Sequence, residues 1–251
     1  MTRVILLTDF GTADGYAAAM AGVIASAAPQ AIVEHAAHDV AAGDLFGAAL
    51  ALSRYAHLYP AGTVHLVVVD PGVGTTRRAL AAELGGRFFV APDNGVLTLV
   101  LRDAASARLV RLSDRDAPSA TFHGRDVFAP AAGRLAAGTP LEELGPAVDD
   151  PVLLELPAPA RHPDGVYGEV LHVDRFGNLI TNIPAAWARS AGEVWLGFAR
   201  VGPLRTTYGD VGDGEPLAVV GSLGLLEVCV RNGSAAHRLS AGRGAPVYME
   251  P

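Results

Sequence analysis

The chain has 251 residues, of which 50% are hydrophobic and 18% are charged, and this length can form one large domain or two unequal ones. Its formal net charge of −7 comes without a basic cluster, which argues against nucleic acid as a partner because phosphates demand clustered lysine and arginine. No apolar run approaches the ~20 residues that cross a membrane, and the single cysteine, Cys229, excludes an intramolecular disulfide and a cysteine-built zinc site.

The first apolar stretch is short and meets Asp9 at once, so it lacks the layout of a signal peptide. We therefore expect a cytoplasmic protein that does not enter a membrane.

Strand-like and helix-like segments alternate through residues 1–155. The apolar runs that predict strands are Val4–Leu7, Ala31–Glu34, Val64–Val69, Phe88–Ala91 and Arg108–Leu112. Helix-like stretches fill the first two intervals, at Tyr16–Ala28 and Asp44–His57. This alternation predicts βαβ units and an α/β domain with a layered, mostly parallel sheet.

Residues 156–165, LPAPARHPDG, contain three prolines and predict a linker. Residues 166–251 then hold short β-type runs separated by Gly, Asp and Asn. These runs are Val166–Val173, Leu179–Ile183, Glu193–Phe198, Leu217–Val220 and Leu225–Val230. They predict a second, smaller all-β domain, an antiparallel barrel or sandwich.

The segment VVVDPGVGTTRR carries the most informative residues. Asp70 ends a buried strand, at the place where open α/β sheets usually put their chemistry. Arg77 follows seven residues later, and His123 lies 46 residues beyond Arg77 in TFHGRDVFAP. A carboxylate, a guanidinium and an imidazole brought together could orient and polarise a water molecule. The alternative is a loop salt bridge with an unrelated histidine, and the spacing favours neither interpretation.

Two further carboxylates have a binding and a structural interpretation. Asp9, at the end of the first strand, could accept hydrogen bonds from a ribose diol, or it could cap a helix or a turn. Asp174, in VDRFGNLITNI, could pair with an ammonium while Asn178 reads an adenine edge. A simple β-turn is the alternative there, and composition alone favours it.

The glycines of the segment after Asp70 do not form a phosphate-binding motif. Gly72 and Gly74 lack the third glycine of a dinucleotide fingerprint, and no G-x-x-x-x-G-K-[ST] occurs. A ligand that carries no phosphate group would need neither the dinucleotide fingerprint nor the phosphate loop.

Six segments in order resemble the S-adenosylmethionine hydroxide adenosyltransferases, which are relatives of the fluorinase and chlorinase. They are LLTDFGTADGY, VVVDPGVGTTRR, APDNGVLTLVL, TFHGRDVFAPAAGRLAAG, VDRFGNLITNI and VRNGSAA, and the resemblance runs from Thr8 to about Ala236. It implies hydrolysis of S-adenosylmethionine at the ribose C5′ to adenosine and methionine. It also implies that S-adenosylmethionine is the substrate, with no cofactor and no metal.

The resemblance also assigns roles. It places Asp70, Arg77 and His123 on the attacking water, Asp9 on the ribose diol, Asp174 on the methionine ammonium and Asn178 on adenine. Further substrate contacts fall on Phe122, Ser222, Glu227, Arg231 and the backbone at Gly233. An anionic Asp70 would repel a halide and accept a proton from water, so we expect water or hydroxide as the nucleophile. The family forms trimers, which implies a homotrimer with active sites between subunits.

Two other functions stay open. One is a metal-dependent phosphohydrolase with oxygen ligands at strand ends: Asp9, Asp70, Asp93 and Asn94. The other is a sensor that binds an adenosyl ligand without turnover.

Overall fold

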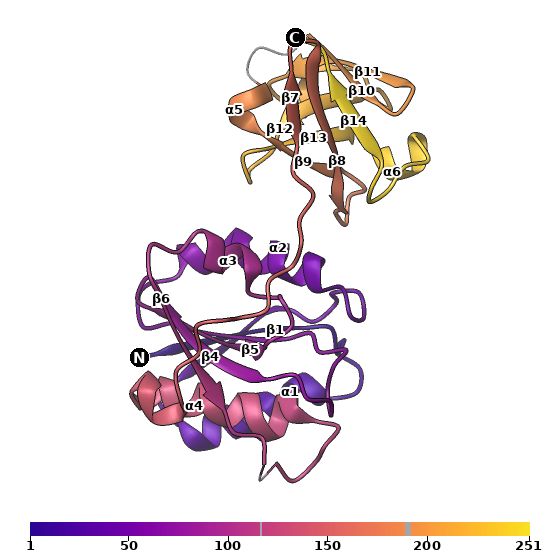
Figure 1. Ribbon diagram of the computed structural model, residues 1–251. Helices are drawn as coiled ribbons and strands as arrows, with labels where there is room; N and C mark the ends of the chain where they lie inside the picture. Colours follow the sequence, from indigo (N-terminus) through magenta and orange to yellow (C-terminus); the bar gives the residue numbers. More distant parts are fainter. Residues whose placement is uncertain (116, 189–191) are drawn as a thin grey trace. The chain divides into compact units, whose positions relative to one another are not determined.

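The computed structural model describes residues 1–115, 117–188 and 192–251. The chain divides into two compact units, Met1–Leu154 and Glu155–Pro251, and each has its own hydrophobic core (Figure 1). No helix in the described part of the chain is long and apolar enough to cross a membrane.

The first unit contains a six-stranded sheet. Its strands are β1 (Arg3–Thr8), β2 (Ile32–Ala37), β3 (Val64–Val68), β4 (Ala79–Leu84), β5 (Arg87–Pro92) and β6 (Ala107–Leu112). They lie in the order β2-β1-β3-β5-β4-β6. The pairings β1–β2, β1–β3 and β3–β5 are parallel, whereas β4 runs antiparallel to both of its neighbours. The prediction of a mostly parallel, layered sheet is confirmed.

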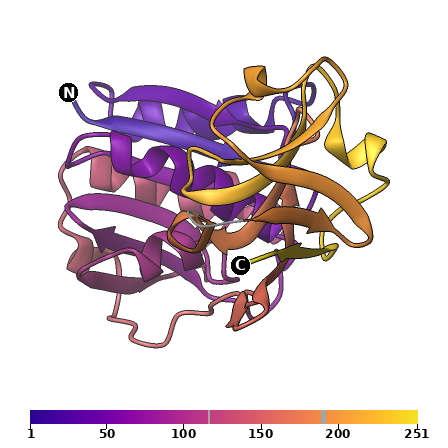
Figure 2. The same ribbon diagram turned by 90° about the horizontal axis from the view of Figure 1, so that it is seen from above.

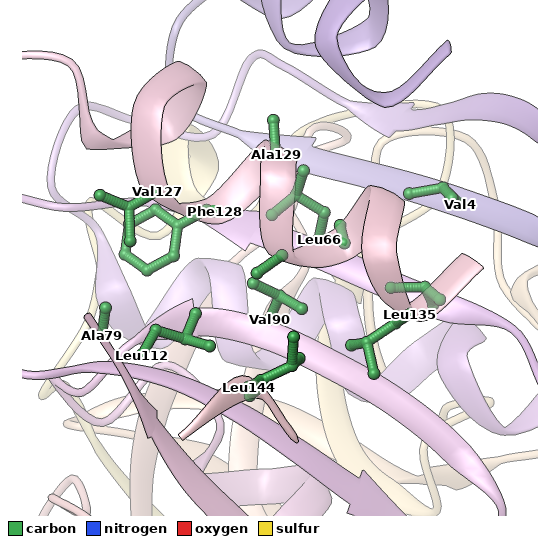
Figure 3. Packing of buried hydrophobic residues seen from close by; sticks show 14 of the residues in the cluster. Val4, Leu66, Ala79, Val90, Leu112, Val127, Phe128, Ala129, Leu135 and Leu144 are labelled. Carbon is green, nitrogen blue, oxygen red and sulfur yellow. The ribbon is translucent and has the colours of Figure 1, made fainter. Parts of the chain in front are cut away.

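Helices cover both faces of this sheet. They are α1 (Tyr16–Ala27), α2 (Leu45–Tyr55), α3 (Thr98–Arg102) and α4 (Ala129–Ala136), with 3-10 turns η1 (Ala56–Leu58) and η3 (Leu141–Leu144) and a π-helical turn η2 (Gly124–Phe128). Figure 1 shows α2 and α3 on one face and α1 and α4 on the other. Figure 3 shows Val4, Leu66 and Val90 of the sheet meeting Ala129 and Leu135 of α4 in one buried cluster.

The strand β4 was not expected from the sequence. Its residues, ALAAEL, are rich in alanine and helix-favouring side chains, so they carry little β-propensity. The pair Gly85–Gly86 joins β4 to β5, and both glycines have positive φ, +56° and +76°. A two-residue glycine turn is a strong hairpin signal, and it could have revealed the strand.

The second unit is a β-barrel. Its strands are β7 (Ala160–His162), β8 (Gly165–Val173), β9 (Leu179–Pro184), β10 (Glu193–Leu196), β11 (Ala199–Arg205), β12 (Pro216–Val220), β13 (Leu225–Val230) and β14 (Pro246–Met249). Short helical segments, α5 (Ala185–Ala188), η4 (Tyr208–Asp210) and α6 (Ala235–Arg238), lie between them. Among the described residues, seven strands in the order β14-β10-β11-β12-β13-β9-β8 close through the β14–β8 pairing (Figures 1 and 2). The expected all-β, barrel-like domain is confirmed.

Several boundaries in the second unit differ from the expected ones. The strand β7 lies inside residues 156–165, which were predicted as a linker. The strand expected at Glu193–Phe198 ends at Leu196, because Gly197 (φ +56°) turns the chain into β11 and leaves Phe198 fully exposed. The strands β11 and β14 were not predicted.

Candidate active site

The first candidate residues lie where the central strands of the sheet end. Asp9 directly follows β1, and Asp70 lies two residues beyond the end of β3, its neighbour in the sheet. The carboxyl ends of parallel strands meet at one edge, so the sheet itself brings these carboxylates to the same edge. The turn after Asp70 returns the chain through Arg77 to β4, and His123 directly precedes the π-helical turn η2.

Asp70, Arg77 and His123 form one hydrogen-bonded cluster. The Arg77 Nε lies 2.9 Å from Asp70 Oδ1 and 3.1 Å from Oδ2, and its Nη2 also pairs with Oδ2. The same Nη2 lies 2.9 Å from His123 Nδ1. The Asp70 and Arg77 side chains are only 5% and 8% exposed, and His123 is buried. The histidine is therefore part of the ion-pair network, and the interpretation as an unrelated residue does not hold.

The Arg77 contact fixes the hydrogen-bonding state of the imidazole. A guanidinium only donates hydrogen bonds, so His123 Nδ1 must be the acceptor in this contact. The ring is then neutral and carries its proton on Nε2. His123 therefore offers a donor on its remaining nitrogen, while Asp70 remains an acceptor of hydrogen bonds or of a proton.

A hollow of about 280 Å³ lies next to this cluster. Its walls include Asp70 and His123, together with Val68, Val73, Thr121, Gly124 and three aromatic rings. The rings of Phe10, Tyr16 and Phe122 contact one another edge to face, with centroids 5.2–6.0 Å apart. Such an apolar wall limits the access of bulk water to the polar cluster.

Phe122 was expected from the sequence as a contact residue, whereas Phe10 and Tyr16 were not. Phe10 directly follows Asp9, and Tyr16 opens the helix α1. An aromatic residue beside a candidate ligand-binding carboxylate was the available signal for Phe10. Nothing in the pattern around Tyr16 separates it from an ordinary surface residue.

Asp9 holds a loop rather than capping a helix. Its Oδ2 accepts a hydrogen bond from the Gly43 backbone N–H at 2.9 Å, while the N-cap of the helix α1 is Gly15. The helix-cap interpretation is therefore wrong. Asp9 is not among the residues that line the hollow, but its neighbour Phe10 is.

The side chains considered as metal ligands each have protein partners. Asp93 pairs with Arg78 and accepts the Val152 N–H at 2.8 Å. Asn94 bonds the Val69 carbonyl at 2.9 Å, and Asp70 is held by Arg77. Within residues 1–115, 117–188 and 192–251, no group of three or more His, Cys, Asp or Glu side chains is arranged to hold a metal ion. The geometry thus gives the phosphohydrolase interpretation no support.

In the second unit, Asp174 and Asn178 are joined within one turn. Asp174 Oδ1 accepts the backbone N–H groups of Phe176 and Asn178, both at 2.9 Å, and Oδ2 accepts Asn178 Nδ2 at 2.9 Å. This is the β-turn geometry that composition favours. Asn178 Oδ1 takes part in none of these three hydrogen bonds. The ligand-binding roles of Asp174 and Asn178 stay predictions.

The remaining candidates of the barrel lie on β13 or in the turns beside β12 and β13. Glu227 is buried on β13, and any Cβ at Gly221 would collide with its carboxylate. Ser222 is exposed in the turn between the two strands. Arg231 donates to the Val211 carbonyl at 2.6 Å and pairs with Asp213, while Gly233 N–H bonds the Val230 carbonyl at 3.2 Å.

Tyr208 lies beside Cys229 and Glu227 and was not expected from the sequence. Tyr208 is 46% exposed, and partial desolvation of its phenol, followed by the neighbouring Cys229, Glu227 and Asp174, raises the pKa of Tyr208 to about 12. Burial also raises the pKa of the Cys229 thiol to about 12. Both groups are therefore neutral at pH 7 and can act only as hydrogen-bonding or packing partners there.

The structure therefore defines a protein of two units, an α/β unit with a polar cluster at its strand ends and a closed β-barrel that follows it. The chain belongs to the S-adenosylmethionine hydroxide adenosyltransferase family, whose N-terminal domain model matches residues 4–145 and whose C-terminal domain model matches residues 168–248.

Several proteins are similar to this chain over most or nearly all of its length. A protein of Thermus thermophilus named (R)-S-adenosyl-L-methionine hydrolase is 46% identical over 99% of this chain and 100% of its own length. The Salinispora tropica protein of the same name is 43% identical over 94% of this chain and 93% of its own length. A fluorinase of Actinopolyspora mzabensis is 27% identical over 98% of this chain and 96% of its own length. The crystal structure of an uncharacterized conserved protein from Thermotoga maritima matches with a TM-score of 0.91 at 35% identity, over 99% of this chain and 100% of that one.

Proposed function

We propose that the protein hydrolyses S-adenosyl-L-methionine at the ribose C5′, giving adenosine and L-methionine. The observation that carries this proposal is the Asp70–Arg77–His123 cluster beside an aromatic-walled hollow. Family membership and the hydrolase name of the relatives at 43% and 46% identity support it. Those names specify the (R) configuration, so we extend the proposal to the (R)-sulfonium epimer.

The proposed reaction is a direct substitution by water. The water oxygen forms a bond to C5′ while the C5′–S bond breaks, and its electron pair returns to sulfur, so methionine leaves as a neutral thioether. The water loses one proton, for which the Asp70 carboxylate is the acceptor. Because the sulfonium is already an activated leaving group, no acid needs to protonate it.

Each member of the cluster has a distinct part in this proposal. Because His123 Nδ1 accepts from Arg77, the proton of the neutral ring is on Nε2. This Nε2–H donates to the water oxygen and fixes the orientation of the water. Arg77 holds both the Asp70 carboxylate and the His123 ring in place. The rings of Phe10, Tyr16 and Phe122 keep bulk water away, so a single positioned water attacks.

Substrate recognition is divided between residues of both units. We assign Asp9 to the ribose diol, because Oδ2 is held by Gly43 and Oδ1 has no such bond among the described residues. We assign Asp174 to the methionine ammonium and Asn178 to adenine, with Ser222, Glu227, Arg231 and Gly233 as further contacts. The reaction needs no cofactor or metal in this scheme. We place it in the cytoplasm and in a homotrimer whose active sites are shared by neighbouring subunits.

The test uses purified protein and both sulfonium epimers of S-adenosyl-L-methionine, with products separated chromatographically. We expect equimolar adenosine and methionine, faster from the (R) epimer, and unchanged rates in EDTA. Substrate binding without turnover would favour the sensor. Loss of activity in EDTA with recovery on adding a divalent ion would contradict the metal-free scheme, and a 5′-halo nucleoside in chloride would contradict the role of Asp70.

A further inference from the structure

A buried hydrogen-bond chain leads from the end of β1 to the surface. Thr8, the last residue of β1, is fully buried, and its Oγ1 lies 2.8 Å from His38 Nδ1. His38 is also buried, and its Nε2 lies 2.7 Å from Nδ1 of the exposed His35. The mechanism proposed above uses none of these three side chains.

The hydrogen-bond directions in this chain follow from the contacts of Thr8. Its Oγ1 already accepts the Phe10 backbone N–H at 3.2 Å. If His38 Nδ1 also donated to it, the hydroxyl proton would have no acceptor among the described residues. The arrangement in which Thr8 donates to His38 Nδ1, and His38 Nε2–H donates to His35, satisfies every group. Burial, followed by the neighbouring His35, lowers the pKa of His38, which favours this neutral ring.

His38 thereby holds both ends of the turn that carries Asp9. Its side chain bonds Thr8 before the turn, and its backbone carbonyl accepts the Gly11 N–H at 2.7 Å after the turn. Five residues later, the Gly43 N–H bonds Asp9 itself at 2.9 Å. The turn between Thr8 and Gly11 presents both Asp9 and Phe10, so its position sets where the carboxylate and the aromatic wall lie.

We propose that His38 is a positioning residue for substrate binding: through Thr8 and Gly11 it fixes the Asp9–Phe10 turn without touching the substrate. This inference rests on the proposed function in one respect, the assignment of Asp9 to the ribose diol. Loss of the His38 side chain should therefore weaken the binding of nucleosides that have free 2′- and 3′-hydroxyls.

The experiment compares His38→Leu, His38→Asn and Thr8→Val with the wild type, using calorimetry with adenosine and 2′,3′-dideoxyadenosine. Asn retains an acceptor where Nδ1 lies, and Leu does not. We expect His38→Leu and Thr8→Val to weaken adenosine binding about tenfold and His38→Asn to stay within about threefold of wild type. Dideoxyadenosine lacks the diol, so its affinity should fall much less than that of adenosine in His38→Leu, within about threefold of its affinity for the wild type. His57→Leu, at an exposed histidine in η1, serves as the control.

A double-mutant cycle separates positioning through Asp9 from general damage. If His38 acts through Asp9, the Asp9→Ala/His38→Leu variant should bind adenosine no more weakly than Asp9→Ala alone. In turnover assays, His38→Leu should raise KM by the same factor as the adenosine Kd, with kcat within about threefold of wild type. Fully additive losses, or a fall in kcat at constant KM, would overturn the proposal. A wild type that fails to hydrolyse S-adenosyl-L-methionine would contradict the proposed function alone, because the adenosine cycle still decides the role of His38.

Discussion

Arg77 contacts both other members of the Asp70–Arg77–His123 cluster, so its shape matters as much as its charge. One guanidinium holds Asp70 through Nε and Nη2 and also reaches His123 from the same Nη2. Its Nη1 has no hydrogen-bond acceptor among the described residues, and the guanidinium carbon lies 5.1 Å from the centre of the Phe128 ring. A lysine has one ammonium on a flexible stem and cannot make this set of contacts.

At His123, the tautomer leads to a specific prediction. If the ring serves as a donor through Nε2, His123→Gln should keep much of the activity, since its amide can donate from a similar position. His123→Leu should lose ~10²–10⁴-fold in kcat with little change in KM. Steady-state kinetics on both variants provides the measurement. Equal losses in the two variants would instead indicate that His123 takes a proton.

A second prediction concerns His65, which is fully buried on β3. Both ring nitrogens lack a hydrogen-bond partner in the described part of the chain, and the ring stacks on Phe89 at 5.0 Å. Burial, followed by the charge of Arg87, lowers the pKa of His65 to about 4. Below pH 6.5 the unfolded chain binds a proton that the folded protein does not, so stability falls as the pH drops from about 6.5 to 4.

The expected loss of unfolding free energy over this range is about 3 kcal/mol, from the difference between the two pKa values. Urea unfolding at several pH values measures it, with His65→Phe as the matched variant because other groups also titrate there. The wild type should lose stability relative to His65→Phe as the pH falls. Parallel curves for the two proteins would contradict the prediction.

At the scale of elements, a glycine sets the distance between α1 and α4. A Cβ on Gly133 of α4 would lie 2.6 Å from the Ala27 Cβ, whereas a Cβ on Gly22 of α1 would meet nothing within 4 Å. We expect Gly133→Ala to lower the unfolding free energy by ~1 kcal/mol or more, because overpacking outweighs the gain in helix propensity. Gly22→Ala should raise it by ~0.5–1 kcal/mol. Thermal or urea unfolding of both variants checks the pair, and a stabilised Gly133→Ala would show that the helices can separate without cost.

The sequence was most informative where a local pattern decides the structure. The apolar runs before Asp9 and Asp70 identified β1 and β3, and a polar residue at such a strand end identified both candidate carboxylates. The strand β4 was not predicted because its alanines have little β-propensity, and they form a strand through pairing with β5 and β6 on either side. The aromatic wall and the His123 tautomer depend on side chains from distant segments, so no local pattern contains them.

At the scale of the whole molecule, neither unit contains all the proposed substrate contacts. Asp9 and the cluster proposed to act on the attacking water lie within Met1–Leu154, and Asp174 and Asn178 lie within Glu155–Pro251. Because the proposed trimer combines the units of neighbouring subunits, an inactive variant in each unit should complement the other.

The corresponding prediction uses Asp70→Ala and Asn178→Ala, mixed after dissociation and reassembly. Some interfaces should then pair two intact units, so the mixture should recover part of the activity that each variant lacks alone. Each variant taken through the same treatment by itself is the control. A monomer in light scattering with full turnover would refute shared sites.

The π-helical turn beside His123 has a consequence for how this protein can change over evolutionary time. In η2 the Ala129 N–H bonds the Gly124 carbonyl, five residues back, so the turn holds one residue more than an α-helical turn. Losing a single codon within this turn would restore ordinary helical pairing and rotate the preceding chain by about 100° relative to α4. The His123 imidazole would then move away from the Arg77 guanidinium, although Asp70, Arg77 and His123 would all still be encoded. A lineage could therefore lose the proposed chemistry by a deletion that a comparison of these three residues alone would not detect.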